Sequence, residues 1–244
     1  MASTVRIGDL TVNRLGFGAM RLCGTNIWGP PKDRAAAHAV LRKAYDLGLN
    51  FFDTADSYGP HVDEELIAET LHPYTKDLVI ATKGGLLRPR PGAWDPDGRP
   101  EHLKRAIDGS LKRLKLECID LYQLHAPDAK VPFADSVGAL ADGQRAGKIR
   151  HVGLSNVSVR QLEEARIAFL PWYPLGGGAA LKSSKVKSLA KKHRARPAQI
   201  ALAWLLAKSP VVLPIPGTAD LEHLEENAGA AQLTLSPAEM RELN

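Results

Sequence analysis

The feature that most constrains the fold of this chain is a regular alternation of short apolar runs with longer segments of helical periodicity. A strand with one face in water alternates apolar and polar residues, whereas these runs are apolar throughout, as in strands buried on both faces. The runs are residues 15–19, 49–53, 78–83, 119–125, 149–155, 167–172 and 211–216. Such strands separated by helices indicate a parallel sheet covered by helices.

The segments between the runs have the signatures of helices. In residues 103–114, apolar side chains recur at three- and four-residue spacing, which places them on one helix face. Asp33 is an expected N-cap of a helix that ends before Gly48. Ser236-Pro237-Ala238-Glu239 is a capping box with proline at the first helical position, which predicts a last short helix. The other predicted helices are 62–71, 133–145, 159–166, 186–192 and 197–207.

Length and element order together predict a single barrel domain. A (β/α)8 TIM barrel has about 250 residues, and this chain has 244 residues with no break in composition that would separate two domains. We therefore expect residues 1–244 to form one α/β domain, a (β/α)8 barrel. Residues 5–12 precede the first barrel strand and predict a β-hairpin with a Gly-Asp turn that caps one end of the barrel.

The sequence supplies seven barrel strands where eight are needed. The predicted helix that ends at Arg166 runs directly into the strand that starts at Ile167, so one strand–helix unit of roughly 30 to 40 residues is absent at this junction. Either the chain has lost the unit, which would leave two open sheet edges, or the protein contains it and the 244 residues leave it out. We favour the second interpretation. It predicts that the Cα atoms of Arg166 and Ile167 lie farther apart than the ~3.8 Å of a trans peptide.

Composition and charge exclude several classes of protein. Hydrophobic residues make up 44% of the chain and charged residues 24%, as in an ordinary globular protein. No apolar run reaches the ~18 residues of a membrane helix, and no secretory signal is visible. Two separated cysteines, Cys23 and Cys118, indicate a reducing cytoplasm. The net charge of +5 is spread over many segments, so we expect no nucleic-acid partner and no membrane partner.

Titratable side chains follow the predicted strands at the ends where barrel active sites lie. Asp53, Lys83 and His125 each end a strand, and Tyr58 comes five residues after Asp53. Taken singly, each has an ordinary explanation, as a turn-forming aspartate, a solvated lysine, a loop tyrosine or a satisfied histidine. Because all four face one mouth of the predicted barrel, we expect them to form a catalytic site.

The residue types in this set suit the reduction of a carbonyl group. A lysine beside an aspartate forms a buried ion pair, and a positive charge near a tyrosine favours the phenolate and so lowers the tyrosine pKa. Tyr58 would then be a general acid that protonates a developing alkoxide. In this interpretation Lys83 tunes Tyr58, Asp53 orients Lys83, and His125 holds the carbonyl oxygen.

Ordered motifs over nearly the whole chain resemble those of the aldo-keto reductase superfamily, whose members are NADP(H)-dependent (β/α)8 barrels. The chain is similar to bacterial-type members of that family. The matching motifs are Asp53-Thr54-Ala55-Asp56-Ser57-Tyr58, Ile80-Ala81-Thr82-Lys83, Ile119-Asp120-Leu121-Tyr122-Gln123-Leu124-His125, Gly147-Lys148-Ile149-Arg150-His151-Val152-Gly153-Leu154-Ser155-Asn156, Pro171-Trp172-Tyr173-Pro174-Leu175-Gly176, and Ile215-Pro216-Gly217-Thr218 followed by Glu225-Glu226-Asn227.

The resemblance implies a catalytic tetrad of Asp53, Tyr58, Lys83 and His125 and an NADP(H) site. In the family a serine–asparagine pair holds the nicotinamide carboxamide together with a glutamine on the strand that this sequence lacks. An aromatic residue stacks on the nicotinamide, and a threonine binds the adenosine 2′-phosphate. The cofactor-binding residues implied here are Met20, Asp53, Ser155, Asn156, Trp172, Pro174, Leu175, Gly176, Thr218, Glu226 and Asn227.

The chain departs from the family at the phosphate end of the cofactor. Many relatives have lysine at the position of Gly217 and arginine at that of His223. Arginine makes bidentate phosphate contacts that histidine cannot make. NADP(H) stays the better expectation than NAD(H), helped by the positive charge of the chain.

The resemblance leaves the substrate and one alternative function open. Trp28 and Trp94 stand in loops rich in glycine and proline and are expected to contact a small carbonyl substrate together with His125, with Arg88 and Arg90 nearby. A second possibility is a cofactor-sensing regulatory barrel with little turnover. A metal-dependent hydrolase is disfavoured because the sequence has neither HxH nor HExxH. We expect a monomer.

Overall fold

The computed structural model describes residues 4–165, 180–208 and 212–243. Its strands are β1 (Thr4–Ile7), β2 (Leu10–Asn13), β3 (Phe17–Gly18), β4 (Phe51–Asp53), β5 (Val79–Gly84), β6 (Leu86–Leu87), β7 (Asp95–Pro96), β8 (Ile119–Leu124) and β9 (Ile149–Leu154). Its α-helices are α1 (Arg34–Asp46), α2 (Val62–Leu71), α3 (Pro100–Leu114), α4 (Phe133–Arg145), α5 (Val159–Ala165), α6 (Ser184–His193), α7 (Pro197–Lys208), α8 (Leu221–Gly229) and α9 (Pro237–Leu243). Short 3₁₀ helices are η1 (Ala19–Leu22), η2 (Thr25–Ile27), η4 (Ala180–Lys182) and η5 (Ala230–Gln232).

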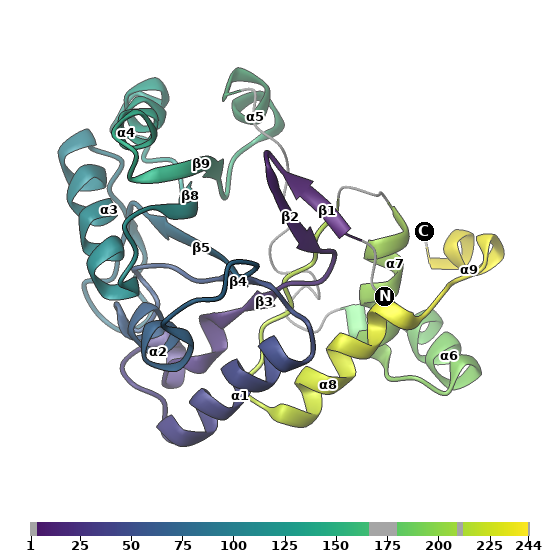
Figure 1. Cartoon of the computed structure of the whole chain (residues 1–244). Coiled ribbons are helices and arrows are strands. Elements are labelled where there is room, and N and C mark those ends of the chain that lie inside the picture. Colours follow the sequence, from purple (N-terminus) through teal and green to yellow (C-terminus); the bar gives the residue numbers. More distant parts are fainter. Residues whose placement is uncertain (1–3, 166–179, 209–211, 244) are drawn as a thin grey trace.

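A parallel sheet with the order β3-β4-β5-β8-β9 forms the centre of the molecule (Figure 1). Neighbours in the sheet are successive strand–helix units of the chain, as in a barrel. A segment from the C-terminal part lies beside β3, because Gly16 N donates to Pro214 O at 3.0 Å and Gly18 N to Pro216 O at 3.4 Å. A Cβ at Gly18 would come within 2.8 Å of Ile215 O, so glycine permits this close approach.

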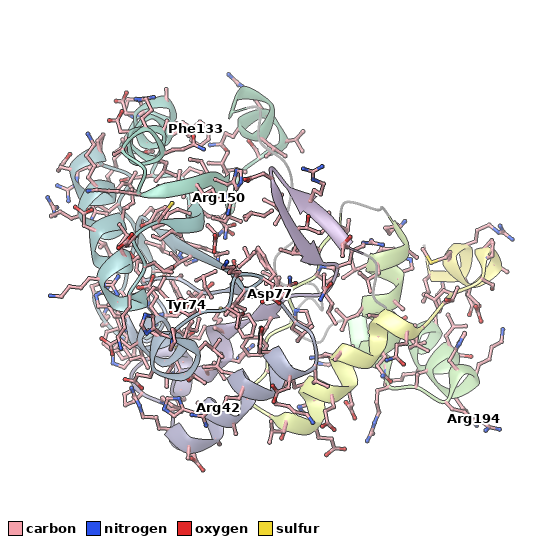
Figure 2. The ribbon with its side chains drawn as sticks, viewed as in Figure 1. Arg42, Tyr74, Asp77, Phe133, Arg150 and Arg194 are labelled. Atoms are coloured by element: carbon pink, nitrogen blue, oxygen red, sulfur yellow. The ribbon has the colours of Figure 1, made fainter. Side chains whose placement is uncertain are left out.

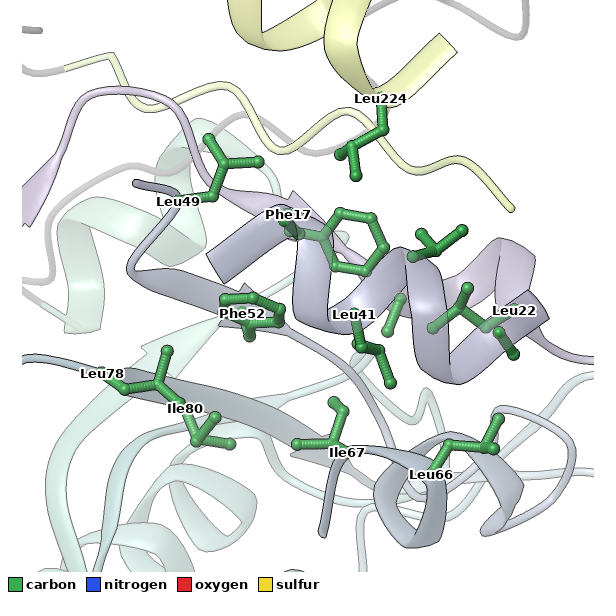
Figure 3. Packing of buried hydrophobic residues seen from close by; sticks show 14 of the residues in the cluster. Phe17, Leu22, Leu41, Leu49, Phe52, Leu66, Ile67, Leu78, Ile80 and Leu224 are labelled. Atoms are coloured by element: carbon green, nitrogen blue, oxygen red, sulfur yellow. The ribbon is translucent and has the colours of Figure 1, made fainter. Parts of the chain in front are cut away.

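The helices α1, α2, α3 and α4 follow one another around the outer side of the sheet (Figure 1). Figure 3 shows the apolar layer between sheet and helices, where Phe17 and Phe52 point at Leu41 of α1 and Ile67 of α2. The rings of Phe17 and Phe52 are 5.4 Å apart. Leu224 of α8 packs in the same cluster, so the C-terminal part of the chain shares this core with the first strands.

The hairpin of β1 and β2 closes the opposite end of the sheet from the strand ends that carry Asp53 and Lys83. Asp9 in its turn accepts hydrogen bonds from Arg150 at 2.5 Å and pairs with His151 at 2.6 Å, both at the start of β9 (Figure 2). Val12 of the hairpin lies in a buried inner cluster with Phe51 and Leu121. The predicted capping hairpin is confirmed.

Most predicted elements are present within one to three residues of their predicted bounds. The N-cap of α1 is confirmed, since Asp33 accepts from Ala36 N at 2.9 Å. The capping box of α9 is confirmed by two reciprocal hydrogen bonds between Ser236 and Glu239. The strand predicted at 15–19 is shorter. The strand predicted at 211–216 is not formed in its described part, 212–216, although Pro214 and Pro216 accept hydrogen bonds from Gly16 and Gly18.

Two predictions cannot be compared with the fold. The strand predicted at 167–172 and the junction of Arg166 with Ile167 lie outside the described residues. Within the described ranges, no helix is long and apolar enough to cross a membrane. The basic side chains of Arg42 on α1 and Arg194 after α6 are exposed (Figure 2).

Candidate active site

Neighbouring strands bring the predicted catalytic side chains to one buried place. Asp53 ends β4, Lys83 lies near the end of β5, and His125 follows β8. These strands are adjacent in the sheet in that order. The three residues and Tyr58 are each 3–6% exposed, so their interactions occur with little water present.

Lys83 and Asp53 form the central ion pair of the site. Lys83 Nζ bonds to Asp53 Oδ1 and to Thr54 O, the latter at 2.8 Å. The second carboxylate oxygen of Asp53 accepts from Gln123 Nε2 at 3.0 Å. Because both oxygens are bonded, the pair has the additional hydrogen bonds that a buried ion pair needs. Sequence reasoning missed Gln123, although its spacing of two residues from His125 on β8 places both on one face of the sheet.

Tyr58 lies against both the ion pair and His125. Lys83 Nζ is 5.3 Å from the centroid of the Tyr58 ring. The Tyr58 and His125 rings meet edge to face at 5.6 Å. The structure therefore brings together all four side chains of the predicted tetrad, and their catalytic roles stay a prediction.

The expected lowering of the Tyr58 pKa is wrong. Burial raises the pKa of the Tyr58 phenol well above 10.0, and the carboxylates of Asp53 and Asp63 raise it further. The physical reason is that Asp53 neutralises Lys83, so the ammonium does not offset the loss of water around the phenol. Tyr58 is therefore a protonated phenol at neutral pH.

His125 is a neutral imidazole held by a residue that the sequence analysis did not single out. Burial lowers its pKa well below 6.5, and the charges of Lys83 and Arg88 lower it further. Ser57 Oγ lies 3.1 Å from His125 Nδ1. When Ser57 donates this hydrogen bond, the ring proton is on Nε2, which is then a hydrogen-bond donor. Ser57 stands inside the Asp53–Tyr58 motif, which is the signal that could have identified it.

The expected substrate residues lie over Tyr58 and His125. The Trp94 ring is 6.5 Å from the Tyr58 ring and 6.3 Å from the His125 ring, with edge-to-face geometry in both cases. Trp28 belongs to a loop that is bonded to the tyrosine loop, since Gly29 N donates to Gly59 O at 2.7 Å. Both indoles are partly exposed. The structure thus places an aromatic rim around a protonated phenol and a neutral imidazole.

Ser155 and Asn156 lie beside His125 at the end of β9. Asn156 Nδ2 donates to the His125 carbonyl oxygen at 2.8 Å and to Ser155 Oγ at 3.2 Å. Asn156 has a left-handed backbone with φ of 56°, a conformation that asparagine tolerates better than most residues. The two polar side chains therefore adjoin the catalytic candidates, as a carboxamide site beside the reacting centre requires.

Comparison with known proteins identifies the family. A sequence model described as "Aldo/keto reductase family" matches residues 14–175 and 176–244. The chain belongs to the aldo/keto reductase family. Among the described residues no group of three or more histidine, cysteine, aspartate or glutamate side chains could hold a metal ion.

Several relatives are similar over almost the whole chain. An uncharacterized oxidoreductase of Schizosaccharomyces pombe is 46% identical, with 96% of this chain and 87% of that protein covered. The pyridoxine 4-dehydrogenase of Escherichia coli is 40% identical, with 96% and 95% covered. An aldo-keto reductase of S. pombe whose name carries NADP(+) is 32% identical, with 98% and 90% covered. The crystal structure of a thermostable aldo-keto reductase with the inhibitor epalrestat superposes with a TM-score of 0.85 at 29% identity, covering 99% and 98% of the two chains.

The (β/α)8 barrel predicted from the sequence is the fold of this family. The alignments with the first two relatives are 266 and 272 positions long, which exceeds the 244 residues of the chain. These two relatives therefore carry positions that have no counterpart in this chain, and the absence of one strand–helix unit after α5 stays a prediction. The family's nicotinamide glutamine, expected on that strand, has no candidate among the described residues.

The structure explains one departure from the aldo/keto reductase pattern at the phosphate end. A Cβ at Gly217 would come within 2.7 Å of Gly18 O, so a lysine does not fit at this position without a backbone shift. Thr218 next to it is 8% exposed, and its hydroxyl accepts from Asp220 N at 3.1 Å. Asp220 is the N-cap of α8, where it accepts from His223 N at 2.9 Å.

The other cofactor candidates are only partly accounted for by the structure. Asn227 on α8 is buried, whereas Glu226 forms an ion pair with Arg196 Nε at 2.8 Å. Met20 is half-buried in η1, at the end of β3 that faces the mouth. Trp172, Pro174, Leu175 and Gly176 lie outside the described residues.

The residues that are described fit a nicotinamide cofactor at two places. Ser155 and Asn156 offer hydroxyl and amide groups next to His125. At the other place, Thr218 offers a hydroxyl group to an anion, whereas the first turn of α8 is already capped by the Asp220 carboxylate and carries Glu222.

Proposed function

We propose that this protein is an NADPH-dependent carbonyl reductase that acts on aldehydes or ketones and, in reverse, oxidises alcohols. The observation that carries the proposal is the buried contact of Tyr58 with His125 and with the Lys83–Asp53 pair. Membership of the aldo/keto reductase family and the relative named with NADP(+) support NADP(H) as the cofactor.

NADPH, when bound, supplies a hydride to the carbonyl carbon of the substrate. The chain's own residues hold the carbonyl oxygen and deliver a proton to it. Neutral His125 donates a hydrogen bond from Nε2 to that oxygen, with its tautomer set by Ser57. The Tyr58 O–H bond then breaks, and its proton moves to the alkoxide oxygen. Lys83 stabilises the phenolate that remains, Asp53 holds Lys83 in place and is itself held by Gln123, and water returns the proton to Tyr58.

Residues of two regions would hold the cofactor. Ser155 and Asn156 would bind the nicotinamide carboxamide, and the Thr218 hydroxyl would bind the 2′-phosphate. Asn227 would contact the adenine. Glu226 would also contact the adenine, and to do so it must either keep its ion pair with Arg196 or replace it with the contact to the adenine. Trp172 and the segment 174–176 remain proposed contacts to nicotinamide and pyrophosphate.

The second candidate is a cofactor-sensing barrel in which binding rather than turnover matters. A pure sensor has no need of a neutral histidine and a protonated tyrosine that face one rim. The complete buried tetrad therefore favours turnover. We further propose one domain over residues 1–244, a monomeric state and a cytoplasmic location, with no nucleic-acid or membrane partner.

A turnover measurement tests the proposal against the sensor. Purified protein is mixed with NADPH and a series of aliphatic and aromatic aldehydes, including pyridoxal because the E. coli relative is named for pyridoxine. We expect multiple turnovers per protein molecule, followed as loss of NADPH absorbance. Tight binding of NADPH without turnover of any aldehyde would support the sensor instead. Failure to bind NADPH at all would contradict both.

A further inference from the structure

Arg88 is a buried cation that the proposed mechanism does not use. It is 8% exposed, and among the described residues no carboxylate lies within ion-pair distance of it. Its guanidinium instead donates to three backbone oxygens, those of Asn26 at 3.1 Å, Ile27 at 3.0 Å and Ser57 at 3.3 Å. Burying a charge without an opposite charge is costly, so its position calls for a physical explanation.

The Arg88 guanidinium also contacts both indoles of the rim. Its Cζ lies 3.6 Å from the centroid of the Trp94 ring and 5.5 Å from that of the Trp28 ring. These distances are those of cation–π contacts, which are strengthened by the loss of water. One side chain thus connects the loop after β3, the loop after β5 and the loop that carries Ser57 and Tyr58.

The loop that Arg88 holds is strained. Asn26 and Ile27 have φ angles of 59° and 57°, and the left-handed region is unfavourable for a β-branched residue such as isoleucine. The carbonyl groups of these same two residues accept the Arg88 hydrogen bonds. Arg88 therefore holds the backbone in a shape that presents Trp28 at the mouth, and this shape would relax without it.

We propose that Arg88 is a positioning and specificity-determining residue that fixes Trp28 and Trp94 as a preformed aromatic rim, so that the site prefers flat aromatic or heteroaromatic aldehydes. The inference rests on the proposed carbonyl reduction and names its substrate class. A flat ring stacks on an indole face while its aldehyde oxygen reaches Tyr58 and His125. A short aliphatic aldehyde has no ring to stack and gains little from the rim.

Arg88→Met and Arg88→Lys test the proposal, because methionine keeps length without charge and lysine keeps charge without the planar fork. Arg105→Met on the outer face of α3 is the control, since Arg105 is exposed and has no bonded partner among the described residues. The readout is the ratio of kcat/KM for pyridoxal or benzaldehyde to kcat/KM for propanal. We expect this ratio to fall at least tenfold in both Arg88 variants through a higher KM for the aromatic aldehyde, and to stay unchanged in Arg105→Met.

A binding measurement separates the inference from the proposed reduction. Pyridoxine and benzoate are titrated into the protein without cofactor, and quenching of tryptophan fluorescence reports their contact with the rim. We expect saturable quenching in the wild type and at least tenfold weaker binding in Arg88→Met. If the wild type reduces no aldehyde but binds these ligands at least tenfold more tightly than Arg88→Met does, the proposed reduction is contradicted and the inference about the aromatic rim is still supported.

Two results would overturn the inference. One is an unchanged aromatic-to-aliphatic ratio in a folded Arg88→Met protein. The other is an equal loss for propanal and benzaldehyde, which would mean that Arg88 supports the whole site and not its selectivity. If Arg88→Met does not fold, Trp28→Leu and Trp94→Leu replace it as tests, because both variants keep the hydrogen bonds of Arg88 to backbone oxygens. Each must then lower the ratio of kcat/KM for the aromatic aldehyde to kcat/KM for propanal. A ratio at the wild-type value in both tryptophan variants would equally contradict the proposal.

Discussion

At the residue scale, the hydroxyl group of Tyr58 is the proposed proton donor. Tyr58→Phe removes this hydroxyl and leaves the ring contacts with His125 and Trp94 in place. General acid catalysis contributes about 10²- to 10⁴-fold, so we expect kcat for an aldehyde to fall by about that factor with an unchanged Kd for NADPH. Steady-state kinetics and a fluorescence titration of NADPH measure the two quantities. Near wild-type kcat in the variant would assign the acid to another group, with His125 the next candidate.

The neighbouring Lys83 acts on the same proton transfer. Lys83→Met removes the charge that stabilises the Tyr58 phenolate and leaves Asp53 buried with Gln123 as its remaining side-chain donor. We expect a loss of kcat similar to that of Tyr58→Phe, together with a lower free energy of unfolding because a buried carboxylate loses its partner. In the double variant the two losses of kcat are far from additive. A product of the two single effects would show that the residues act in separate steps.

The pKa directions of the site predict the pH profile of reduction. Burial lowers the His125 pKa well below 6.5, so the imidazole charges only at a more acidic pH. Burial raises the Tyr58 pKa well above 10.0, so the phenol keeps its proton through the neutral and mildly alkaline range. We therefore expect kcat to show no loss as pH falls through 6.5 or rises toward 10.0. A break near 6.5 that persists in His38→Gln, a substitution on the outer helix α1, would mean that burial does not lower the pKa of His125.

Sequence alone located the tetrad but not the residues that hold it. Motif and strand-end position sufficed for Asp53, Lys83 and His125. The bonds of Ser57 to His125 and of Gln123 to Asp53 join residues 68 and 70 positions apart. Such pairs depend on the register between strands, which periodicity does not give. The predicted direction of the Tyr58 pKa shift was wrong for a similar reason, since the shift depends on burial and on the carboxylates of Asp53 and Asp63.

At the scale of elements, helices were predicted well because their signals are local. The Asp33 cap and the Ser236–Glu239 box lie within four residues of the turns they begin. The strands near the C-terminal part were predicted less well, because their form depends on contacts across the chain. Gly16 and Gly18 bond to Pro214 and Pro216, which lie almost 200 residues away, and no local pattern encodes that pairing.

The layer between helices and sheet sets the stability of these elements. Leu41 on α1 is fully buried in the cluster with Phe17 and Phe52 (Figure 3). Leu41→Ala removes buried methyl groups and leaves a cavity, so we expect a loss of about 2–5 kcal/mol in the free energy of unfolding. Leu47→Ala at the exposed end of the same helix is the matched control, with an expected loss below about 1 kcal/mol. Urea denaturation measures both, and equal losses would place Leu41 outside the core.

At the scale of the whole molecule, length and alternation sufficed to predict a barrel. The family match and the solved relative bear out this fold. The same alternation predicts that one strand–helix unit is absent, because a barrel requires eight; the junction concerned lies outside the described residues, so this stays a prediction. The sequence alone could not show how residues far apart in the chain, those proposed to bind the cofactor, are arranged around one end of the sheet. Ser155 follows β9, whereas Gly217, which precedes Thr218, lies beside Gly18 at the other end of the described sheet.

The proposed cofactor spans these distant parts, so its binding stabilises the whole molecule. The Thr218 hydroxyl is the proposed contact to the 2′-phosphate, and we expect NADPH to bind at least tenfold more tightly than NADH. At a concentration 100 times the Kd of NADPH, NADPH then stabilises the fold by about 2.7 kcal/mol and NADH by about 1.4 kcal/mol. Thermal denaturation with each cofactor should give a Tm increase about twice as large for NADPH. Thr218→Val keeps the side-chain volume and removes the hydroxyl, so it should reduce the NADPH increase and leave the NADH increase unchanged. Equal shifts of Tm with the two cofactors in the wild type would contradict the preference, and a parallel loss of both shifts in Thr218→Val would place the hydroxyl away from the phosphate.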